Sequence, residues 1–148
     1  MLLVSSPLVE TVIGHAINVH RVLGPGLFES VYEQCFEHEL DLHGIRFRRQ
    51  IPLSLTYRTL RIDCAYRVDL IVEDELLVEL KSIERLLPLH HTQALTYLKL
   101  SGCRQALLIN FNVQRLADGV KSFLAKSKHE GNEGNEGHEE ENPNKSPS

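Results

Sequence analysis

The feature that most constrains the fold of this chain is the segment RVDLIVEDELLVELKS, residues 67–82, in which two apolar runs flank a short acidic turn. Two such runs separated by a few polar residues are typical of a β-hairpin. The length of the turn decides which side chains share a face of the hairpin. A two-residue turn would place Asp69 opposite Val78 and would mix polar with apolar side chains on both faces.

A three-residue loop, Glu73-Asp74-Glu75, gives a more consistent hairpin. It leaves one face wholly apolar, which is the arrangement that fixes strand register in a half-buried sheet. On the other face, this register places Asp69 directly opposite Glu79, with Lys81 two residues further along. Opposed Cβ atoms in such a pair lie about 4.5–5.5 Å apart. The apolar pairs that it predicts are Val72 with Leu76, Leu70 with Val78, and Val68 with Leu80.

These three polar side chains have the chemistry of a metal-dependent hydrolytic site. Two opposed carboxylates repel one another unless a cation lies between them, and Mg²⁺ binds carboxylate oxygens while keeping several waters. Lys81 could orient or help deprotonate a metal-bound water, or neutralise charge that develops on a phosphate. The alternative is a charge cluster on an exposed sheet face. The apolar register favours the functional interpretation, because it independently brings Asp69, Glu79 and Lys81 together.

Hydrophobic periodicity predicts several helices. A first helix is interrupted by Gly24-Pro25-Gly26, a triplet that does not continue a helix. Further helices are predicted over residues 28–42 and 89–100, followed by Gly44 and Gly102 as C-terminal caps. The apolar side of the first helix consists of Val9, Val12, Ile13, Ala16, Ile17 and Leu23.

Strands and a last helix complete the predicted domain. The strand-like segments are residues 45–51, 53–57, 60–66, 68–72, 76–82 and 106–111, and the last helix covers about residues 113–124. This order of elements predicts an α/β fold of the mixed α+β kind.

Charge and composition divide the chain into two parts. Residues 127–148 form an acidic tail rich in Gly, Asn and Glu, in which six Glu and two Lys give the whole net charge of −4. The tail lacks apolar anchors, so we expect it to be disordered. The predicted domain, residues 1–126, holds fourteen acids and fourteen bases. Any binding of nucleic acid must therefore come from a local patch.

Other sequence features indicate a cytoplasmic protein that does not enter a membrane. No run of eighteen apolar residues is present, and the N-terminus lacks the basic region of a signal peptide. Cys35, Cys64 and Cys103 lack the paired spacing of zinc sites and are expected to be reduced thiols. The histidines of the first two helices show no ligand spacing with a convergent partner; they are His15, His20, His38 and His43.

Four motifs in order resemble those of a known family. Asp69, followed ten residues later by Glu79-Leu80-Lys81, resembles the PD-(D/E)xK nuclease signature. The segment QALTY, residues 93–97, resembles the QxxxY motif of the RecB-type branch of that superfamily. The segment GLFESVY, residues 26–32, resembles the motif of the GxxExxY proteins, and LLINF, residues 107–111, resembles their penultimate segment.

The resemblance covers about residues 9–124 and implies a restriction-endonuclease-like core, with a central mixed β-sheet flanked by helices. It implies that Asp69 and Glu79 bind Mg²⁺ or Mn²⁺, with the Leu80 carbonyl as a further ligand, and that Lys81 is the catalytic lysine. Glu29 would be an additional acid beside the metal. The departures from the family pattern are Gln105 and Ala106, and they concern strand packing.

Supporting roles are less constrained by the residues themselves. The resemblance implies that Gln93 and Tyr97, an i, i+4 pair, support the site or contact DNA. Glu29 near a helix N-terminus is also explained by the helix dipole alone. Tyr32, in the motif that begins at Gly26, is expected to be a core aromatic whose hydroxyl reaches water. His90 and His91 open a helix, where they are expected to be solvated.

The arginines keep two interpretations open. Arg46, Arg48 and Arg49 cluster on one predicted strand, and Arg58, Arg61 and Arg67 follow further along the sheet. Such clusters can neutralise phosphates, and they can equally protect an edge strand against aggregation.

The leading hypothesis is a Mg²⁺- or Mn²⁺-dependent nuclease that hydrolyses phosphodiester bonds of nucleic acid, with DNA the expected substrate. One alternative is a catalytically silent module of the same fold that binds nucleic acid or regulates another protein. Another is an accessory subunit that needs a protein partner, and a homo-oligomer is a further option.

Overall fold

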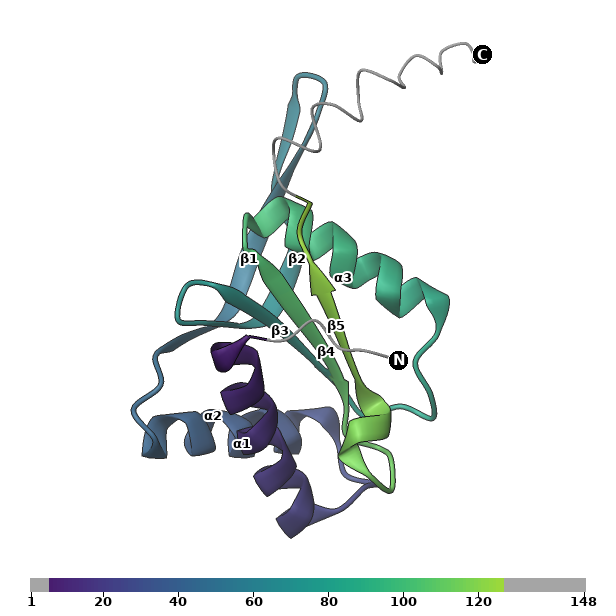
Figure 1. The fold of residues 1–148 in the computed structure, drawn as a ribbon. Helices are drawn as coiled ribbons and strands as arrows, with labels where there is room; N and C mark the ends of the chain where they lie inside the picture. The colour runs from purple at the N-terminus through teal and green to yellow at the C-terminus, as the bar shows by residue number, and fades with distance from the viewer. Residues whose placement is uncertain (1–5, 127–148) are drawn as a thin grey trace.

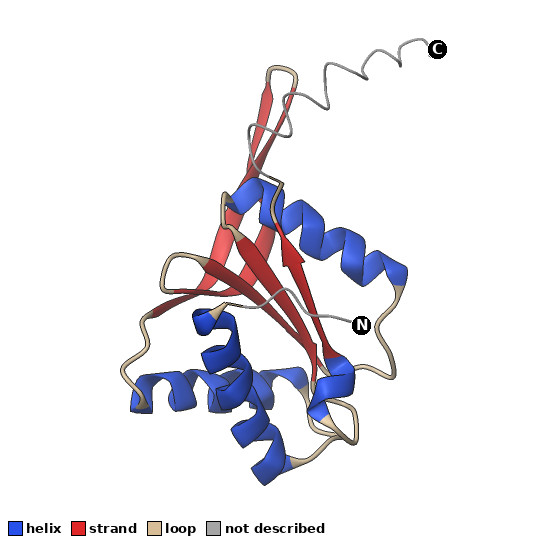
Figure 2. Cartoon of the chain, in the orientation of Figure 1, coloured by secondary structure: helices blue, strands red, loops and turns tan. Residues whose placement is uncertain are grey.

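The structure, a computed structural model, describes residues 6–126. These residues form three α-helices and a 3₁₀ turn packed on a five-stranded sheet (Figures 1 and 2). In chain order the elements are α1 (Pro7–Leu23), α2 (Glu29–Leu42), β1 (Phe47–Tyr57), β2 (Leu60–Val72), β3 (Leu76–Lys81), α3 (Pro88–Ser101), β4 (Gln105–Asn110), η1 (Leu116–Gly119) and β5 (Val120–Leu124). The tail predicted for residues 127–148 lies outside the described residues.

The sheet is mixed, because only one of its strand pairs is parallel. Its strand order is β1-β2-β3-β4-β5, with β3 and β4 parallel and the other neighbours antiparallel. Helix α3 forms the crossover between the two parallel strands, as parallel pairing requires. The predicted mixed sheet flanked by helices is therefore confirmed.

Helices cover both faces of the sheet (Figure 1). Helices α1 and α2 pack on one face, where they enclose the larger core with side chains such as Leu70, Val78 and Ile109. Helix α3 covers the other face and packs with Val68, Ile71, Leu77 and Ala106 among others. The central strands β3 and β4 are consequently buried on both faces, which explains why their sequences are almost continuously apolar.

Gly102 is the C-cap of α3 as predicted, whereas the C-cap of α2 is His43 and the predicted Gly44 comes one residue later. Ser6 caps α1, because its side chain accepts a hydrogen bond from the Val9 N–H at 3.2 Å. The C-cap of α1 is Gly24, with φ of 70°, and that of α3 is Gly102, with φ of 75° in the left-handed region. None of the helices within residues 6–126 combines the length and the apolar content that a membrane-spanning helix needs.

The predicted three-residue loop of the hairpin is confirmed, but one of the residue pairs that it predicts does not form. The ladder between β2 and β3 pairs Val72 with Leu76 and Leu70 with Val78, as the three-residue loop requires. The ladder ends at Leu70, so the predicted pair of Val68 with Leu80 does not form. Val68 instead packs in the core beneath α3 together with Ile71 and Leu77. The face of the hairpin that is predicted to carry the polar side chains is therefore partly apolar and buried.

The predicted last helix, residues 113–124, is wrong. This segment contains the short turn η1 and then β5, which pairs antiparallel with β4 from Ile109↔Val120 to Gln105↔Leu124. Pairing with β4 satisfies the backbone groups of that strand, and this tertiary demand overrides the local preference for a helix. The turn requires Gly119, because a Cβ there would lie 2.2 Å from the Asn110 carbonyl oxygen.

Two further corrections concern the predicted strands. The segments 45–51 and 53–57 form the single strand β1, and the segments 60–66 and 68–72 form the single strand β2. Pro52 is accommodated because β1 is an edge strand of the sheet. The outer part of this long hairpin extends beyond the helices (Figure 1).

A buried asparagine fixes the segment that follows β3. Asn110 is 1% exposed, and its Oδ1 accepts hydrogen bonds from the backbone N–H groups of Ile83 and Asn112 at 3.0 and 3.2 Å. Its Nδ2 donates to the Ile83 carbonyl at 3.0 Å. Asn110 therefore holds the chain two residues after Lys81, which lies opposite Asn110 in the parallel ladder.

We expect Asn110→Ala to lower the free energy of unfolding by about 2–4 kcal/mol, because it removes the acceptor of the part-buried N–H groups of Ile83 and Asn112. The matched control is Asn112→Ala, since Asn112 donates one side-chain hydrogen bond to the same Ile83 carbonyl at 3.2 Å. We expect the control to cost less than about 1 kcal/mol. Urea unfolding measures both values, and equal losses in the two variants would contradict the role assigned to Asn110.

Candidate active site

Two carboxylates and two backbone amides join β2 and β3 where the ladder ends. The Oδ2 atom of Asp69 accepts a hydrogen bond from the Leu80 N–H at 2.8 Å, and the Oε2 atom of Glu79 accepts one from the Asp69 N–H at 3.1 Å. The two strands are thus connected by carboxylates in place of further backbone pairing. Each carboxylate has one oxygen fixed by an amide, so the two groups are held side by side.

Burial makes this pair of carboxylates electrostatically unfavourable when both are ionised. Glu79 is 6% exposed, and burial together with the negative charge of Asp69 raises its pKa to about 8. Burial is also the main cause that raises the pKa of Asp69, although the Leu80 amide acts in the opposite direction. A bound cation would remove this repulsion, and carboxylate oxygens are the ligands that Mg²⁺ and Mn²⁺ prefer.

Lys81 lies close enough to influence both carboxylates. It is half-buried at the end of β3, two residues after Glu79. Its positive charge lowers the pKa of Asp69 and of Glu79, although in both cases burial dominates and the net shift is upward. The charge of Lys81 therefore acts on both of the acids that the sequence singled out, although no ion pair joins Lys81 to either of them among the described residues.

Glu29, an exposed residue at the start of α2, lies in the electrostatic field of Asp69 and Lys81. Within the described residues, however, its carboxylate does not form with Asp69 and Glu79 a group of ligand atoms within 4.8 Å of one another. Glu29 is the first residue of that helix, and burial is the main cause that raises its pKa. The next causes are the charge of Asp69, which raises it, and the charge of Lys81, which lowers it. The helix dipole is therefore an incomplete explanation of Glu29, because its carboxylate also lies in the field of the strand residues.

Helix α3 contributes residues on the opposite side. Burial and then the charge of Glu79 raise the pKa of the Tyr97 phenol, and its ring lies 5.4 Å from that of Tyr66 on β2. Gln93 is half-buried one turn earlier on the same helix. His90 accepts a hydrogen bond from the Leu87 N–H at 2.9 Å, and burial followed by the charge of Lys81 lowers its pKa.

Two residues near the carboxylates were missed by sequence reasoning. Gln50 lies on β1 beside Asp69, and a hydrogen bond from its side chain lowers the pKa of Asp69. The same side chain donates to Glu33 Oε2 at 2.6 Å, so it connects α2 to β1. Gln50 has φ of 51°, which is uncommon outside glycine. The one sequence signal that could have identified Glu33 was its position four residues after Glu29, which places both acids on the same side of the helix.

Tyr32 and Gly26 lie in the supporting structure of α2. Tyr32 is fully buried, and its ring stacks on Phe111 with centroids 4.5 Å apart. Its hydroxyl donates to the Gly24 carbonyl and accepts from the Leu27 N–H at 3.2 Å. The expectation of a core aromatic is confirmed, but the hydroxyl contacts backbone. Gly26, with φ of 97°, lies in the loop that Tyr32 holds.

Most of the candidate phosphate-binding arginines are engaged in ion pairs. Arg46 lies 2.8 Å from Glu73, Arg49 lies 3.1 Å from Glu37, and other pairs are Arg48 with Asp74 and Arg61 with Asp63. Arg48 and Arg49 belong to the edge strand β1, and Arg46 directly precedes it. These contacts favour protection of the edge over a dedicated phosphate patch.

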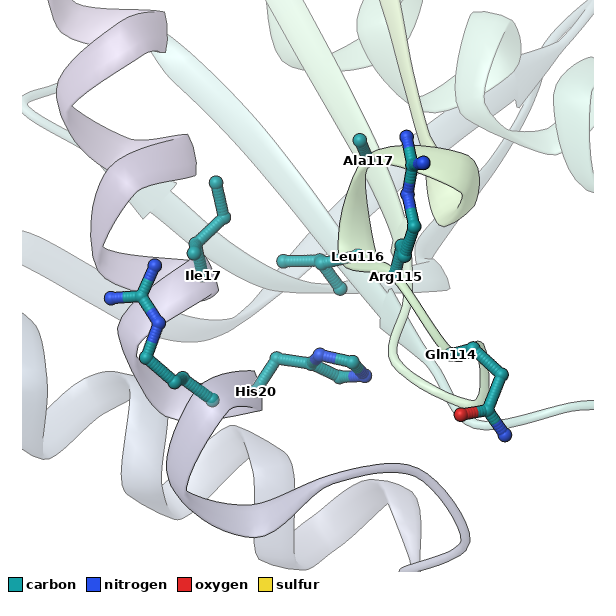
Figure 3. Close-up of a pocket in the computed structure, with 7 residues that line it drawn as sticks. Ile17, His20, Gln114, Arg115, Leu116 and Ala117 are labelled. Atoms are coloured by element: carbon teal, nitrogen blue, oxygen red, sulfur yellow. The ribbon is translucent and has the colours of Figure 1, made fainter.

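A separate surface hollow lies between α1 and η1 (Figure 3). It has a volume of about 330 Å³ and is lined by Ile17, His20, Arg21, Gln114, Arg115, Leu116 and Ala117. The His20 Nε2 atom lies 2.8 Å from the Val113 carbonyl oxygen, so this ring is already hydrogen-bonded. No carboxylate lines the hollow, and it therefore lacks the ligands that a Mg²⁺ site requires.

Comparison with known proteins agrees with this geometry. Residues 6–123 match the family model described as PD-(D/E)XK nuclease superfamily, so the match spans nearly all of the described residues. The chain matches none of the curated proteins and none of the solved structures with which it was compared. Members of this superfamily generally use divalent metal ions and act on nucleic acid. With the mixed sheet, the acids of adjoining strands and the neighbouring lysine in place, the chain belongs to the PD-(D/E)XK nuclease superfamily.

Proposed function

We propose that this chain is a metal-dependent nuclease that hydrolyses phosphodiester bonds, with DNA as its substrate. The observation that carries the proposal is the reciprocal hydrogen bonding between β2 and β3, in which each of the carboxylates of Asp69 and Glu79 accepts from a backbone N–H of the other strand. Two buried acids with raised pKa values are costly for the fold. Their presence is explained if they bind a cation.

In this proposal Asp69 and Glu79 hold Mg²⁺ or Mn²⁺, with the Leu80 carbonyl and Glu29 as further ligands. A bound ion of this kind supplies an activated water and stabilises charge on the phosphate. Lys81 orients the attacking water and offsets negative charge as it develops on the phosphate oxygens. Burial around the site strengthens both electrostatic effects, because less water screens them.

The remaining residues position the substrate or the acids. Tyr97 and Gln93 on α3 contact the nucleic-acid backbone or support the site. Gln50 orients Asp69 through its hydrogen bond, and Glu33 in turn fixes Gln50. We further propose that the chain belongs with the GxxExxY proteins and the RecB-type branch, and that it acts in the cytoplasm. A protein partner or a second copy would supply contacts to nucleic acid.

The arginine pairs favour a second candidate function. Since Arg46, Arg48 and Arg49 are paired with acidic partners, the described residues at the start of β1 offer no conspicuous phosphate patch. This observation suits a catalytically silent module of the same fold that binds nucleic acid or regulates another protein. It also suits an accessory subunit that becomes active with a partner.

One experiment separates these functions. Purified protein is incubated with labelled single- and double-stranded DNA and RNA, in Mg²⁺, in Mn²⁺ and with chelator. The proposed function predicts cleavage that requires the metal and that exceeds cleavage by an identically purified Asp69→Asn variant. Binding without cleavage would indicate the silent module, and cleavage that appears only after lysate is added would indicate the accessory subunit.

A further inference from the structure

A second group of metal-ligating side chains lies between α1 and α2, at the end of α2 remote from Glu29. It consists of His15 on α1 and of Glu39 and His43 at the C-terminal end of α2. One ligand atom from each side chain lies within 4.8 Å of the other two. The sequence predicted no convergent partner for these histidines, and that prediction is wrong. Convergence arises from the packing of two helices, although the spacing Glu39-x-x-x-His43 places two ligands on one helix face.

The distances within this group are close to those of a metal centre. The Nδ1 atom of His15 lies 3.2 Å from the Oε2 atom of Glu39, and the Nδ1 atom of His43 lies 3.8 Å from the same oxygen. In a tetrahedral zinc site with ligand bonds of about 2.0–2.1 Å, two ligand atoms are about 3.3 Å apart. The side chains would therefore need only small rotations to surround an ion.

The surroundings of Glu39 hold the group in place. Asn18, one turn after His15 on α1, donates a hydrogen bond from Nδ2 to Glu39 Oε2 at 3.2 Å. Outer hydrogen bonds of this kind orient the ligands of metal sites. The two imidazole rings are in contact, with centroids 4.2 Å apart and ring planes tilted by 37°. His43 Nδ1 lies 2.9 Å from the Glu39 carbonyl oxygen, and it would exchange this contact for the metal.

We propose that His15, Glu39 and His43 form a Zn²⁺ site that joins α1 to α2, with water in the remaining position. Two imidazoles and one carboxylate suit zinc, whereas Mg²⁺ prefers an all-oxygen set. The side chains of His15 and Glu39 are only 13% and 19% exposed, and that of His43 is 49% exposed. The ion would thus enter from the side of His43.

The proposed zinc site is independent of the proposed nuclease site. Glu29 and Glu39 are ten residues apart on one helix, which corresponds to about 15 Å along its axis. An Asp69→Asn variant is therefore expected to retain zinc binding, so the two proposals succeed or fail separately.

Calorimetric titration of the full chain with Zn²⁺ at neutral pH tests the site. Wild type and Asp69→Asn are expected to bind one ion at this site with equal affinity, and an excess of Mg²⁺ is expected not to displace it. Glu39→Gln and His43→Ala should each weaken binding by at least about tenfold, because each removes one ligand. The matched control is His38→Ala, which alters an exposed histidine of α2 outside the group and should leave the affinity unchanged.

Thermal unfolding supplies a readout that is independent of heat of binding. Zinc that binds only the folded chain must raise the melting temperature of wild type and leave that of Glu39→Gln nearly unchanged. His43 lies at the exposed C-cap of α2, so His43→Ala keeps the test valid if His15→Ala fails to fold. Absence of zinc binding, or equal zinc affinity in wild type, Glu39→Gln and His43→Ala, would overturn the proposal.

Discussion

Asp69→Asn is expected to reduce metal-dependent cleavage by about 10³-fold or more while leaving the fold intact. Lewis-acid stabilisation by a bound metal contributes several kcal/mol to the transition state, and about 4 kcal/mol corresponds to a factor of about 10³. The amide keeps an oxygen that can accept the Leu80 N–H, which Asp69 Oδ2 now accepts at 2.8 Å. The substitution therefore removes the charge that would bind the ion and retains the link between β2 and β3.

The matched control is Asp63→Asn. Asp63 lies on the same strand, is exposed, and forms an ion pair with Arg61 at 2.8 Å on the outer part of the hairpin. We expect this variant to cleave as wild type does, because an exposed pair of this kind contributes little to stability. Initial rates on one substrate, together with circular dichroism of both variants, measure the effect. Equal rates in wild type and Asp69→Asn would show that the activity does not come from this site.

Without metal, the free energy of unfolding is expected to fall as the pH rises from about 4.5 to about 8. The pKa of Glu79 is about 8 in the folded chain, whereas its ordinary value of 4.5 applies in the unfolded chain. Between pH 4.5 and about pH 8 the folded chain therefore holds a proton that the unfolded chain has lost. Stability decreases with pH wherever the folded state binds more protons. Asp69, whose pKa is also raised, acts in the same direction.

Glu79→Gln is expected to flatten this pH profile and to make the metal-free protein more stable than wild type near pH 8. The amide has no charge to bury, and one oxygen remains to accept the Asp69 N–H. The cost is activity, because the variant loses a proposed metal ligand. Urea unfolding in chelator at several pH values measures the effect, with the exposed acid Glu75→Gln as control. A wild-type stability that rises over this pH range would contradict the burial of an ionisable Glu79.

The hairpin and its acids were predictable because their signal is local. A three-residue loop and the alternation of apolar residues fix the register near the turn, and this register brings Asp69 to Glu79. The end of the ladder was not predictable. It depends on the Asp69 carboxylate accepting the Leu80 amide, a side-chain contact that hydrophobic patterning does not encode.

The errors share a physical cause, which is dependence on distant parts of the chain. Strand β5 forms because β4 offers backbone groups to pair, and the apolar pattern of residues 113–124 fits a helix equally well without that partner. Gln50 reaches Asp69 only because β1 lies beside β2. The cluster of His15 with Glu39 requires the packing of α1 on α2, which the sequence alone does not specify.

Calorimetric titration with Mg²⁺ tests most directly whether Asp69 and Glu79 bind one divalent ion. We predict that wild type and Asp63→Asn bind one Mg²⁺ and that Asp69→Asn and Glu79→Gln show no measurable binding. The affinity of wild type should increase as the pH rises towards 8, because the ion competes with the proton on Glu79. Undiminished Mg²⁺ binding by Asp69→Asn and Glu79→Gln would contradict the account.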